Sequence, residues 1–560
     1  MVAAMSKARS PARHVVAPRG TVRLATMARI LIVEPIAASA VERLAAAHAS
    51  EVRLGLERGD ILQLLGEGEG WDGLVVRSQT RVDAELLSAA APRLSVVGVA
   101  SIGIDRIDVD AATRAGVMIV NSPTGNTIAA AEHTMALMLA LLRHVPEANA
   151  SIRSGLWERS RYTGRELRGK TLGIIGLGKI GKLVARRAAG FEMRVIAADP
   201  FLTEEQGTEV GAKLVGLPEL LHRSDVITIH TPLSAQTRGL LGRAQIEATK
   251  PGAFLLNVAR GGLVDEQALA EALASGQLAG AAIDVFSAEP MTPDNPLLDA
   301  PNLVLTPHLG ASTTEAQDRV GLEMADQVLM ALSGVTPPYA VNAPAVAPDT
   351  APKLRPYVEL ARRLAILARQ LAPGAFDAID LTYAGEIAAG ECAPIRTAAV
   401  AGILEAVTDQ RVNAVNADLV AHERGLTVRE ERAPSSDPWA SLIELGVGPA
   451  DGSPTLRLAG STAHGRPHLA ALDGFAIDAE LVGTMLVTRH HDRPGIVGAV
   501  GTMLAEAGIN ISSLELSRLS EHGEAMMFVS VDEAIDDPVL DRIRAADGMS
   551  QVRVVELPAL

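Results

Sequence analysis

The sequence predicts an α/β protein with two Rossmann-like parallel-sheet domains, followed by an α+β domain and a small ferredoxin-like domain. From residue 29 to about residue 310, short runs of Val, Ile and Leu alternate with Ala- and Leu-rich stretches of helical period. A glycine-rich turn directly follows one of these runs, and the C-terminal segment shows the order β-α-β-β-α-β. Continuous apolar strands separated by helices indicate parallel sheets that are covered on both faces.

The apolar runs of the N-terminal half are too numerous for one sheet, so we expect two α/β units. The long helical stretch Ala129–His144 is the expected break between them. The runs interpreted as strands are Ile30–Val33, Gly73–Val76, Ser95–Val99, Val117–Val120, Thr171–Ile175, Arg194–Ala198, Val226–His230, Ala253–Val258, Ala281–Val285 and Leu303–Thr306.

Closely spaced prolines in Thr336–Pro338 and Asn342–Pro356 predict a linker after these two units. A helix is expected at Tyr357–Leu371, and a mixed α+β region extends from there to about residue 480. The final unit is expected to contain, in chain order, strand Met485–Thr488, helix Gly495–Ala507, strands Ile511–Ser517 and Ala525–Val531, helix Pro538–Ala546 and strand Val552–Glu556.

The composition argues against several classes of protein. The net charge is −15 and no basic stripe stands out, so we expect no nucleic-acid partner. No apolar run is long enough to span a bilayer, so no membrane partner is expected, and no metal site is predicted. Cys392 is the single cysteine, which is typical of a protein in a reducing cytoplasm.

Residues 1–27 contain several arginines and no acidic residue. This composition suits an organellar transit segment, and it suits a disordered leader or an over-called start equally well, because Met27 directly precedes the first predicted strand. We favour the second interpretation, since nothing else in the sequence indicates an organelle.

The strongest local motif is a glycine-rich turn within Lys170–Gly181 that follows an apolar strand and opens a helix. Gly176 permits the tight turn, Gly178 lets the backbone approach a pyrophosphate, and Gly181 lets the helix pack closely on the strand. Eighteen residues after Gly181, the next strand ends at Asp199. A carboxylate there can accept both ribose hydroxyls and repels a 2′-phosphate, which favours NAD over NADP; the alternative is a solvated turn residue.

Three polar residues follow later strands and could meet at the carboxyl edge of the same sheet: Arg260, Glu289 and His308. A histidine can accept the hydroxyl proton when a 2-hydroxyacid is oxidised. A carboxylate can orient the imidazole and favour its protonated form, and an arginine can bind the substrate carboxylate and polarise the nascent carbonyl. Taken singly, each has a plainer interpretation as a surface arginine, a turn glutamate or a capping histidine.

The motifs Gly176–Gly181, Asn257–Gly262, Ala288–Pro290 and Pro307–Ser312 together resemble the D-isomer-specific 2-hydroxyacid dehydrogenase family. The resemblance implies that Arg260, Glu289 and His308 form the active site. It also implies NAD contacts at Lys179, Ile180, Asp199, Thr231, Ala259, Asp284, His308 and Gly310. The NAD-binding Rossmann domain, residues 125–313, would then be an insertion in a flavodoxin-like substrate domain made of residues 28–124 and 314–340.

Two loops resemble those that bind the substrate in the phosphoglycerate dehydrogenase subclass of this family. They lie at Val75–Thr80 and Asn121–Asn126. The residues that the resemblance implies for binding 3-phospho-D-glycerate are Arg77, Ser78, Asn121 and Arg159. One loop differs: relatives usually have Arg-Ala-Gly-Thr/Val-Gly where this chain has Val99–Gly103, which removes a potential anion contact.

The C-terminal half resembles the long form of that subclass, with an intervening allosteric domain at residues 341–480 and a terminal ACT domain at residues 484–558. This arrangement implies a role in L-serine biosynthesis and L-serine as an effector held between two ACT domains. The residues implied for the effector are His490, Asp492 and Asn510; the alternative is that Asp492 caps a helix and Asn510 makes a turn. The family is typically dimeric or tetrameric, so a homodimer or homotetramer is expected.

Two other functions fit the same residues. The nearest is a dehydrogenase or reductase for another 2-hydroxyacid, such as glyoxylate, hydroxypyruvate or erythronate 4-phosphate. The other is a non-catalytic scaffold that senses NADH, because a fold alone does not determine function.

Overall fold

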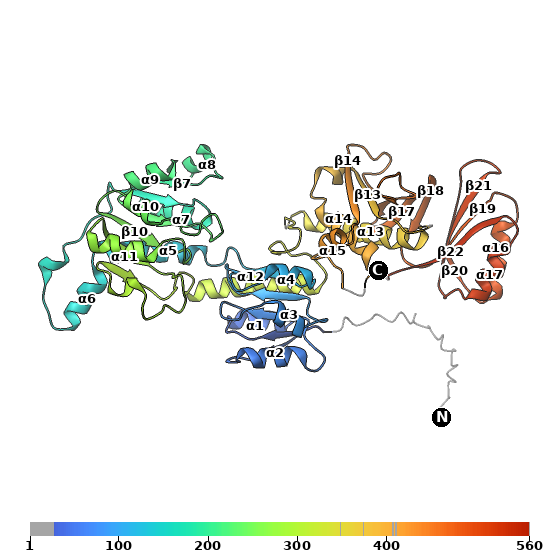
Figure 1. Cartoon of the computed structure of the whole chain (residues 1–560). Helices are drawn as coiled ribbons and strands as arrows, with labels where there is room; N and C mark the ends of the chain where they lie inside the picture. Colours follow the sequence, from blue (N-terminus) through green and yellow to red (C-terminus); the bar gives the residue numbers. More distant parts are fainter. Residues whose placement is uncertain (1–26, 348, 373, 406–407, 409–410, 559–560) are drawn as a thin grey trace, which may run out of the picture.

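The computed structural model describes residues 27–558 except 348, 373, 406, 407, 409 and 410. The predicted leader, apart from Met27, lies outside these described residues. Four sheets follow one another along the chain, and the domains that contain them lie roughly in a row (Figure 1). In space the first domain lies between the second and the third, because the chain returns from the second sheet to the first through α12. The predicted fold class is confirmed: two parallel-sheet domains precede a mixed-sheet domain and a ferredoxin-like domain.

The first sheet has five parallel strands in the order β2-β1-β3-β4-β5. Helices α1 and α12 cover one face, and α2, α3 and α4 cover the other, so the strands are apolar on both sides. The elements are β1 (Arg29–Ile32), α1 (Ala38–Ala45), β2 (Ala49–Val52), α2 (Arg58–Gly66), β3 (Gly73–Val76), α3 (Ala84–Ala89), β4 (Val96–Val99), α4 (Val109–Arg114), β5 (Met118–Asn121) and α12 (Thr314–Leu332).

The second sheet has seven parallel strands in the order β12-β11-β10-β9-β6-β7-β8. Strand β6 is followed by β7 and β8 on one side, and the chain then returns to place β9 on the other side. A ligand crevice opens at such a reversal, beyond the carboxyl ends of the strands. The strands are β6 (Thr171–Ile175), β7 (Arg194–Ala198), β8 (Ala212–Leu214), β9 (Val226–Ile229), β10 (Ala253–Asn257), β11 (Leu278–Ile283) and β12 (Leu303–Leu305).

Helices cover both faces of this second sheet. One core layer packs α5 and α7 against the strands, and the other packs α9, α10 and α11. The helices are α5 (Thr127–Leu142), α6 (Val145–Arg153), η1 (Arg159–Tyr162), α7 (Lys179–Gly190), α8 (Glu204–Thr208), α9 (Leu217–Arg223), α10 (Arg243–Glu247), α11 (Glu266–Ser275) and η2 (Pro296–Asp299).

The chain crosses between the two domains twice, and the crossings touch. Gly125, just before α5, packs against Val320 of α12 so closely that a Cβ at Gly125 would lie 2.6 Å from the Val320 Cγ2 atom. The Arg319 side chain donates to the Gly125 carbonyl at 3.0 Å. The hydroxyls of Ser122 and Thr124 both donate to the Glu323 carboxylate.

The third sheet has six strands in the order β14-β13-β15-β16-β17-β18, with only β13 and β14 parallel. The predicted linker is partly wrong, because α13 starts at Ala351 and includes Pro356. Pro352 lies in the first turn, where N–H groups have no intrahelical partner, whereas Pro356 lies in the second turn and leaves one intrahelical hydrogen bond unmade. The elements are α13 (Ala351–Leu371), β13 (Ala378–Gly385), η3 (Glu386–Ala389), α14 (Ala393–Leu404), α15 (Ala417–Glu423), β14 (Thr427–Ala433), β15 (Ser441–Gly448), β16 (Leu456–Ala463), β17 (Arg466–Leu472) and β18 (Phe475–Glu480).

The fourth sheet is antiparallel, in the order β20-β21-β19-β22, and its element order is the predicted β-α-β-β-α-β. Helices α16 and α17 cover one face. The other face continues the core of the third domain, because Met485, Val487 and Phe528 share one apolar cluster with α13 and its sheet. The elements are β19 (Gly483–His491), α16 (Ile496–Glu506), β20 (Ile511–Arg518), β21 (Glu524–Val531), α17 (Asp537–Arg544) and β22 (Met549–Leu557).

Among the described residues, no single helix is both long and apolar enough to cross a bilayer. Helix α5 taken together with α6 reaches that threshold by length and composition, and the two helices are bent by 61° at the break between them.

A buried arginine joins the last two domains. Arg363 on α13 is 1% exposed, and its guanidinium donates to the carbonyls of Leu481 at 2.6 Å and Pro558 at 2.8 Å. These carbonyls lie just before β19 and just after β22, so a single side chain holds the point where the chain enters the last sheet and the point where it leaves.

We predict that Arg363→Met lowers the free energy of unfolding by about 2–5 kcal/mol, because two buried carbonyls lose their donor. Thermal unfolding followed by calorimetry should show a lower midpoint for the C-terminal transition. The neighbouring Arg362→Met is the matched control, since Arg362 forms an exposed ion pair with Glu405. Equal midpoints for Arg363→Met and Arg362→Met would contradict the prediction.

Candidate active site

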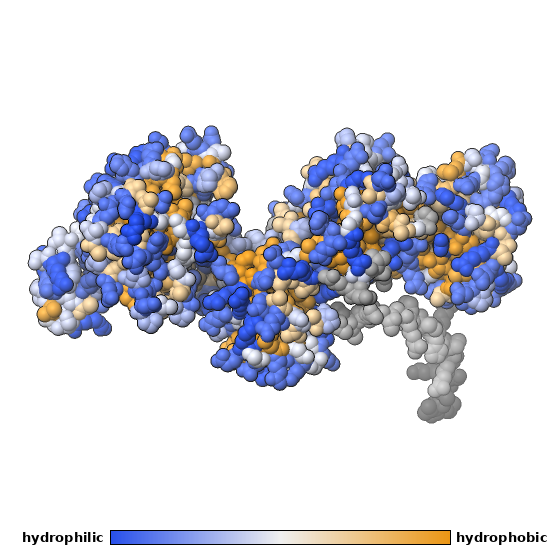
Figure 2. Space-filling model, in the orientation of Figure 1, coloured by the Kyte–Doolittle hydropathy of each residue, from blue (hydrophilic) through white to orange (hydrophobic). Residues whose placement is uncertain are grey.

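A cleft of about 980 Å³ lies between the two parallel-sheet domains. Its walls are loops that follow the carboxyl ends of strands from both sheets, and apolar residues gather where these domains meet (Figure 2). Four of its cationic or titratable residues are Arg77 and Arg106 from the first domain and Arg260 and His308 from the second. Sequence-predicted residues from both domains therefore meet in one place.

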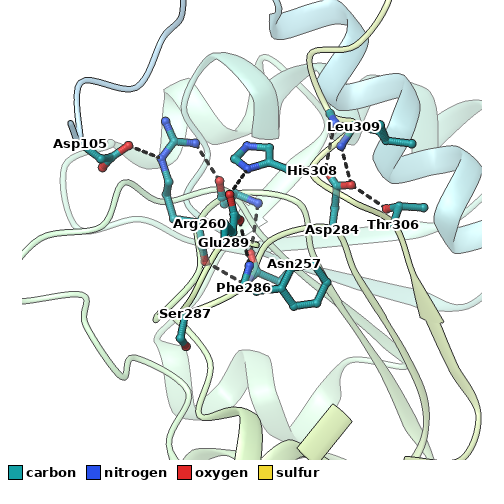
Figure 3. A network of polar contacts seen from close by, with 12 residues as sticks. Asp105, Asn257, Arg260, Asp284, Phe286, Ser287, Glu289, Thr306, His308 and Leu309 are labelled. Atoms are coloured by element: carbon teal, nitrogen blue, oxygen red, sulfur yellow. Dashed lines mark hydrogen bonds and ion pairs between the residues drawn. The ribbon is translucent and has the colours of Figure 1, made fainter. Parts of the chain in front are cut away.

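His308 and Glu289 form a pair at the edge of this cleft (Figure 3). The His308 Nδ1 atom lies 2.7 Å from a Glu289 carboxylate oxygen, and the other oxygen accepts from the Phe286 N–H at 3.0 Å. The hydrogen bond to Glu289 raises the pKa of His308 above its ordinary value, although burial acts in the opposite direction. Because Nδ1 is held by Glu289, Nε2 remains for a molecule in the cleft.

The loop that carries His308 is held by Asp284, which is fully buried. The Asp284 carboxylate accepts from the N–H groups of Leu309 at 2.7 Å and Gly310 at 2.9 Å, and from the Thr306 hydroxyl at 2.6 Å. Burial favours the neutral acid, but these hydrogen bonds and the nearby His133 lower the pKa of Asp284 below its ordinary value. Asp284 and Gly310 were predicted as NAD contacts; here they shape the His308 loop.

His133 on α5 completes this group, with Nε2 3.2 Å from both the Asp284 carboxylate and the Thr306 hydroxyl. Sequence reasoning did not find it. Its position inside an apolar helix is the only signal, and a half-buried polar residue on such a helix favours a hydrogen-bond partner.

Arg260 reaches from the second domain toward the first. Its Nε atom lies 3.3 Å from the Asp105 carboxylate, and Nη1 donates to the Ala259 carbonyl at 2.8 Å. Asn257 holds the turn, because its amide donates to the Arg260 carbonyl at 2.9 Å and accepts from the Ala259 N–H at 3.1 Å. Gly103 leaves room for the guanidinium, since a Cβ there would lie 2.5 Å from Nη2.

The glycine turn has the geometry of a dinucleotide site. Gly176 has φ +90°, and a Cβ on Gly181 would lie 2.2 Å from the Gly176 carbonyl, so helix α7 packs directly on the turn. The space around Gly178 is open, with no atom within 4 Å of an added Cβ. The N-terminus of α7, at Lys179 and Ile180, provides unpaired N–H groups that favour a phosphate.

Asp199 ends β7 beside this turn and accepts from the Leu177 N–H at 2.9 Å and the Phe201 N–H at 3.0 Å. These bonds hold its carboxylate beside the glycine turn. Thr231 has a buried hydroxyl without a hydrogen-bond partner among the described residues. Burial lowers the pKa of the adjacent His230 to about 4, which keeps this edge of the site neutral. The residues present therefore fit NAD.

The predicted substrate loop lies on the opposite wall. Arg77 and Ser78 line the cleft. Glu34, which is 4% exposed, accepts from the backbone N–H groups of Ser78 at 3.0 Å, Gln79 at 3.1 Å and Thr80 at 2.8 Å. Sequence reasoning missed Glu34, although an acidic residue directly after a buried strand is a signal for it.

Two predicted substrate residues do not line the cleft within one chain. The Asn121 amide instead donates to the Ile102 carbonyl at 2.7 Å, which fixes a cleft-wall loop. Arg159 lies on η1, in the arm that α6 begins and that projects from the second domain (Figure 1). Asn126 does line the cleft, and its buried Oδ1 atom has no partner among the described residues.

Within one chain, the predicted effector residue Asn510 lies far from the other two, His490 and Asp492. Asp492 follows β19 and binds the Arg518 guanidinium at 3.1 Å, whereas the Asn510 amide donates to Asp532 at 2.6 Å before β20. The strand register places these two residues at opposite ends of the sheet, on the order of 20 Å apart. The His490 ring is 2% exposed beside the Thr488 hydroxyl, so it is not available to an effector in this arrangement.

Comparison with known families defines the class. Residues 135–310 match the NAD-binding domain of the D-isomer specific 2-hydroxyacid dehydrogenases. Residues 353–472 match the D-3-phosphoglycerate dehydrogenase intervening domain, and residues 484–548 match the ACT domain. Fold and site together define an NAD-dependent dehydrogenase of the D-2-hydroxyacid class.

Curated relatives narrow this class. D-3-phosphoglycerate dehydrogenase from Archaeoglobus fulgidus is 38% identical over 94% of this chain and 100% of its own length. The enzyme of that name from Bacillus subtilis is 40% identical over 87% of this chain and 92% of its own. The structure of a glyoxylate reductase from Paecilomyes thermophila is 32% identical, with a TM-score of 0.52, over 56% of this chain and 98% of its own. The chain belongs to the D-3-phosphoglycerate dehydrogenase family.

We predict that the His308 imidazole titrates above pH 6.5 and that Glu289→Gln lowers this pKa, because the carboxylate that stabilises the charged ring is removed. NMR of histidine-labelled protein, with His308→Asn used for assignment, measures both values. Because the folded-state pKa is raised, the stability from this pair is fully present below pH 6.5 and is lost as the pH rises through the raised value. An unchanged pKa in Glu289→Gln would contradict the assignment.

Proposed function

We propose that this protein oxidises 3-phospho-D-glycerate to 3-phosphooxypyruvate with NAD, the first step of the phosphorylated route to L-serine. The observation that carries the proposal is the His308–Glu289 pair at 2.7 Å, which lines the same cleft as Arg260 and lies on the domain with the dinucleotide turn. The similarity to curated relatives over nearly the whole chain supports the same reaction.

Each residue of the site then has a distinct task. Arg260 binds the substrate carboxylate and, in the cleft, directs C2 toward His308. His308 accepts the proton of the C2 hydroxyl at Nε2, and Glu289 stabilises the imidazolium that forms. The glycine turn Gly176–Gly181 and Asp199 would hold NAD, which would supply the hydride acceptor for C2. Asp284 keeps the His308 loop in position, and Glu34 keeps the Arg77 loop in position.

The division of the chain follows from these tasks. We assign residues 28–124 and 314–340 to substrate binding, residues 125–313 to NAD binding, residues 341–480 to an intervening regulatory domain and residues 484–558 to an ACT domain. The single cysteine, Cys392, supports a cytoplasmic location.

A homodimer or homotetramer is supported by the arm at α6 and η1. Its exposed apolar side chains are Val145 and Ile152, both 54% exposed, Leu156, 51% exposed, and Trp157, 84% exposed. A second subunit that covered these side chains would remove them from water. The same pairing would let Arg159 serve a neighbouring subunit, since it does not line the cleft of its own chain.

A second candidate substrate is an unphosphorylated 2-hydroxyacid. It is favoured by Val99 and Ile102, which make part of the cleft wall apolar. Steady-state kinetics with 3-phospho-D-glycerate, D-glycerate and glyoxylate distinguishes the two candidates. A higher kcat/KM for 3-phospho-D-glycerate supports the first, and preference for an unphosphorylated acid overturns it.

We expect His308→Ala to lower kcat by about 10²- to 10⁴-fold while the Kd for NAD stays near the wild-type value, because His308 handles a proton. Stopped-flow measurement of NADH formation gives kcat, and calorimetric titration with NAD gives the Kd. His222→Ala, on the exposed end of α9, is the control and should behave like wild type. Near-wild-type turnover by His308→Ala would exclude this mechanism, and no turnover by wild type would favour the NADH-sensing scaffold.

We also propose that L-serine binds between two ACT domains, with Asp492 from one subunit and Asn510 from the other. The separation of these residues in one chain supports a shared site. A carboxylate suits the ammonium group of serine, and an amide can both donate and accept.

Calorimetry with L-serine tests this arrangement. Asp492→Ala and Asn510→Ala should each abolish binding, and a mixed oligomer of the two variants should regain one intact site per pair. Regained binding supports the shared site. Binding by either single variant as strong as that of wild type would exclude that residue, and no binding by wild type would exclude serine as the effector.

A further inference from the structure

We infer that Arg106 binds the phosphate end of the substrate and determines the preference for a phosphorylated acid. The inference rests on the proposed function and adds a residue to the substrate side of the cleft. The observation that carries it is a pair of arginines on adjacent loops of the cleft wall, Arg77 and Arg106, whose guanidinium groups have no partner among the described residues.

The two loops belong to neighbouring strands. Strands β3 and β4 are parallel and paired, with Val76 opposite Val99, so the segments that follow them leave the same edge of the sheet side by side. The Val82 N–H donates to the Arg106 carbonyl at 2.9 Å, and the Asp108 N–H donates to the Val82 carbonyl at 2.8 Å. The backbone of Arg106 is therefore tied to the end of the loop that begins with Arg77.

Backbone groups of the Arg77 loop are not available to an anion. The N–H groups of Ser78, Gln79 and Thr80 all point to the buried Glu34 carboxylate. Burial raises the pKa of Glu34, but these hydrogen bonds outweigh burial and lower it, so the carboxylate is ionised at neutral pH. A phosphate near this loop must therefore be neutralised by side chains.

Among the described residues that line the cleft, the arginines are Arg77, Arg106 and Arg260. Arg260 is already paired with Asp105 and belongs to the domain that carries His308. The guanidinium groups of Arg77 and Arg106 have no hydrogen bond or ion pair with any described residue, and Arg106 is exposed. Arg81, which follows on the same loop, is paired with Asp83 and does not line the cleft.

The charges of the substrate match the positions of the three cleft arginines. A three-carbon acid phosphate carries one carboxylate and a phosphate of nearly two negative charges at pH 7. Arg260 pairs with the carboxylate next to His308, and two planar guanidinium groups remain for the phosphate, which arginine binds well. Because Asp105 precedes Arg106 in the chain and contacts Arg260, the two ends of the proposed site are close enough for a short substrate.

The test compares Arg106→Ala with wild type on 3-phospho-D-glycerate and on D-glycerate, which differ only in the phosphate. We expect KM for 3-phospho-D-glycerate to rise about 10- to 100-fold with kcat little changed, because a charge-assisted hydrogen bond to the phosphate is lost. Values for D-glycerate should not change. Arg106→Lys should restore part of the affinity, and Arg81→Ala is the matched control that should match wild type.

Competitive inhibition by inorganic phosphate gives a second measurement that needs no turnover of D-glycerate. Its Ki should rise about tenfold or more in Arg106→Ala and stay constant in Arg81→Ala. Equal losses on both substrates, or an unchanged KM and Ki, would overturn the role of Arg106 while leaving the proposed function intact. A wild-type enzyme that uses D-glycerate but not 3-phospho-D-glycerate would overturn the proposed function together with this inference.

Discussion

The buried carboxylate of Asp284 is the interaction on which the geometry of the cleft depends. It accepts hydrogen bonds from two backbone N–H groups and a hydroxyl of the segment that carries His308. In this segment His308 itself adopts a positive φ of 55°. A positive φ is unfavourable for a residue with a Cβ, so the conformation needs support from its surroundings. Glu34 does the same for the opposite wall. Two buried acids thus define where the cationic side chains of the cleft are held.

Much of this could be predicted from the sequence, because parallel strands and the glycine turn depend on local patterns. Every strand proposed for the N-terminal half is present. The two that were missed, β2 and β8, are short edge strands with polar residues, so they lack the continuous apolar run that marks a buried strand. Helix α13 begins earlier than expected because it accommodates Pro352 in its first turn and Pro356 in its second.

Site residues could be predicted where the residue type and its motif determine the chemistry. They were harder to predict where the direction of the side chain in the folded protein determines whether it reaches the cleft. Arg260, Glu289 and His308 follow recognisable motifs, and the structure brings them together. Asn121 and Arg159 carry suitable groups, but their direction depends on tertiary structure. Supporting residues leave no motif: Glu34 binds backbone N–H groups, and His133 binds two side chains from distant parts of the sequence. Contacts with a second subunit are likewise outside the reach of one sequence.

The paired crossings between the first two domains have a mechanical consequence. Gly125 and Val320 are in van der Waals contact, and Arg319 hydrogen-bonds to the same glycine, so the two connections lie together rather than at opposite ends of the interface. Two bodies joined at one point can turn about it but cannot slide past each other. Any narrowing of the cleft is then a rotation of the two domains about this point. Such a rotation brings the wall that holds Arg77 toward the wall that holds His308, so both ends of a substrate are contacted in the same movement.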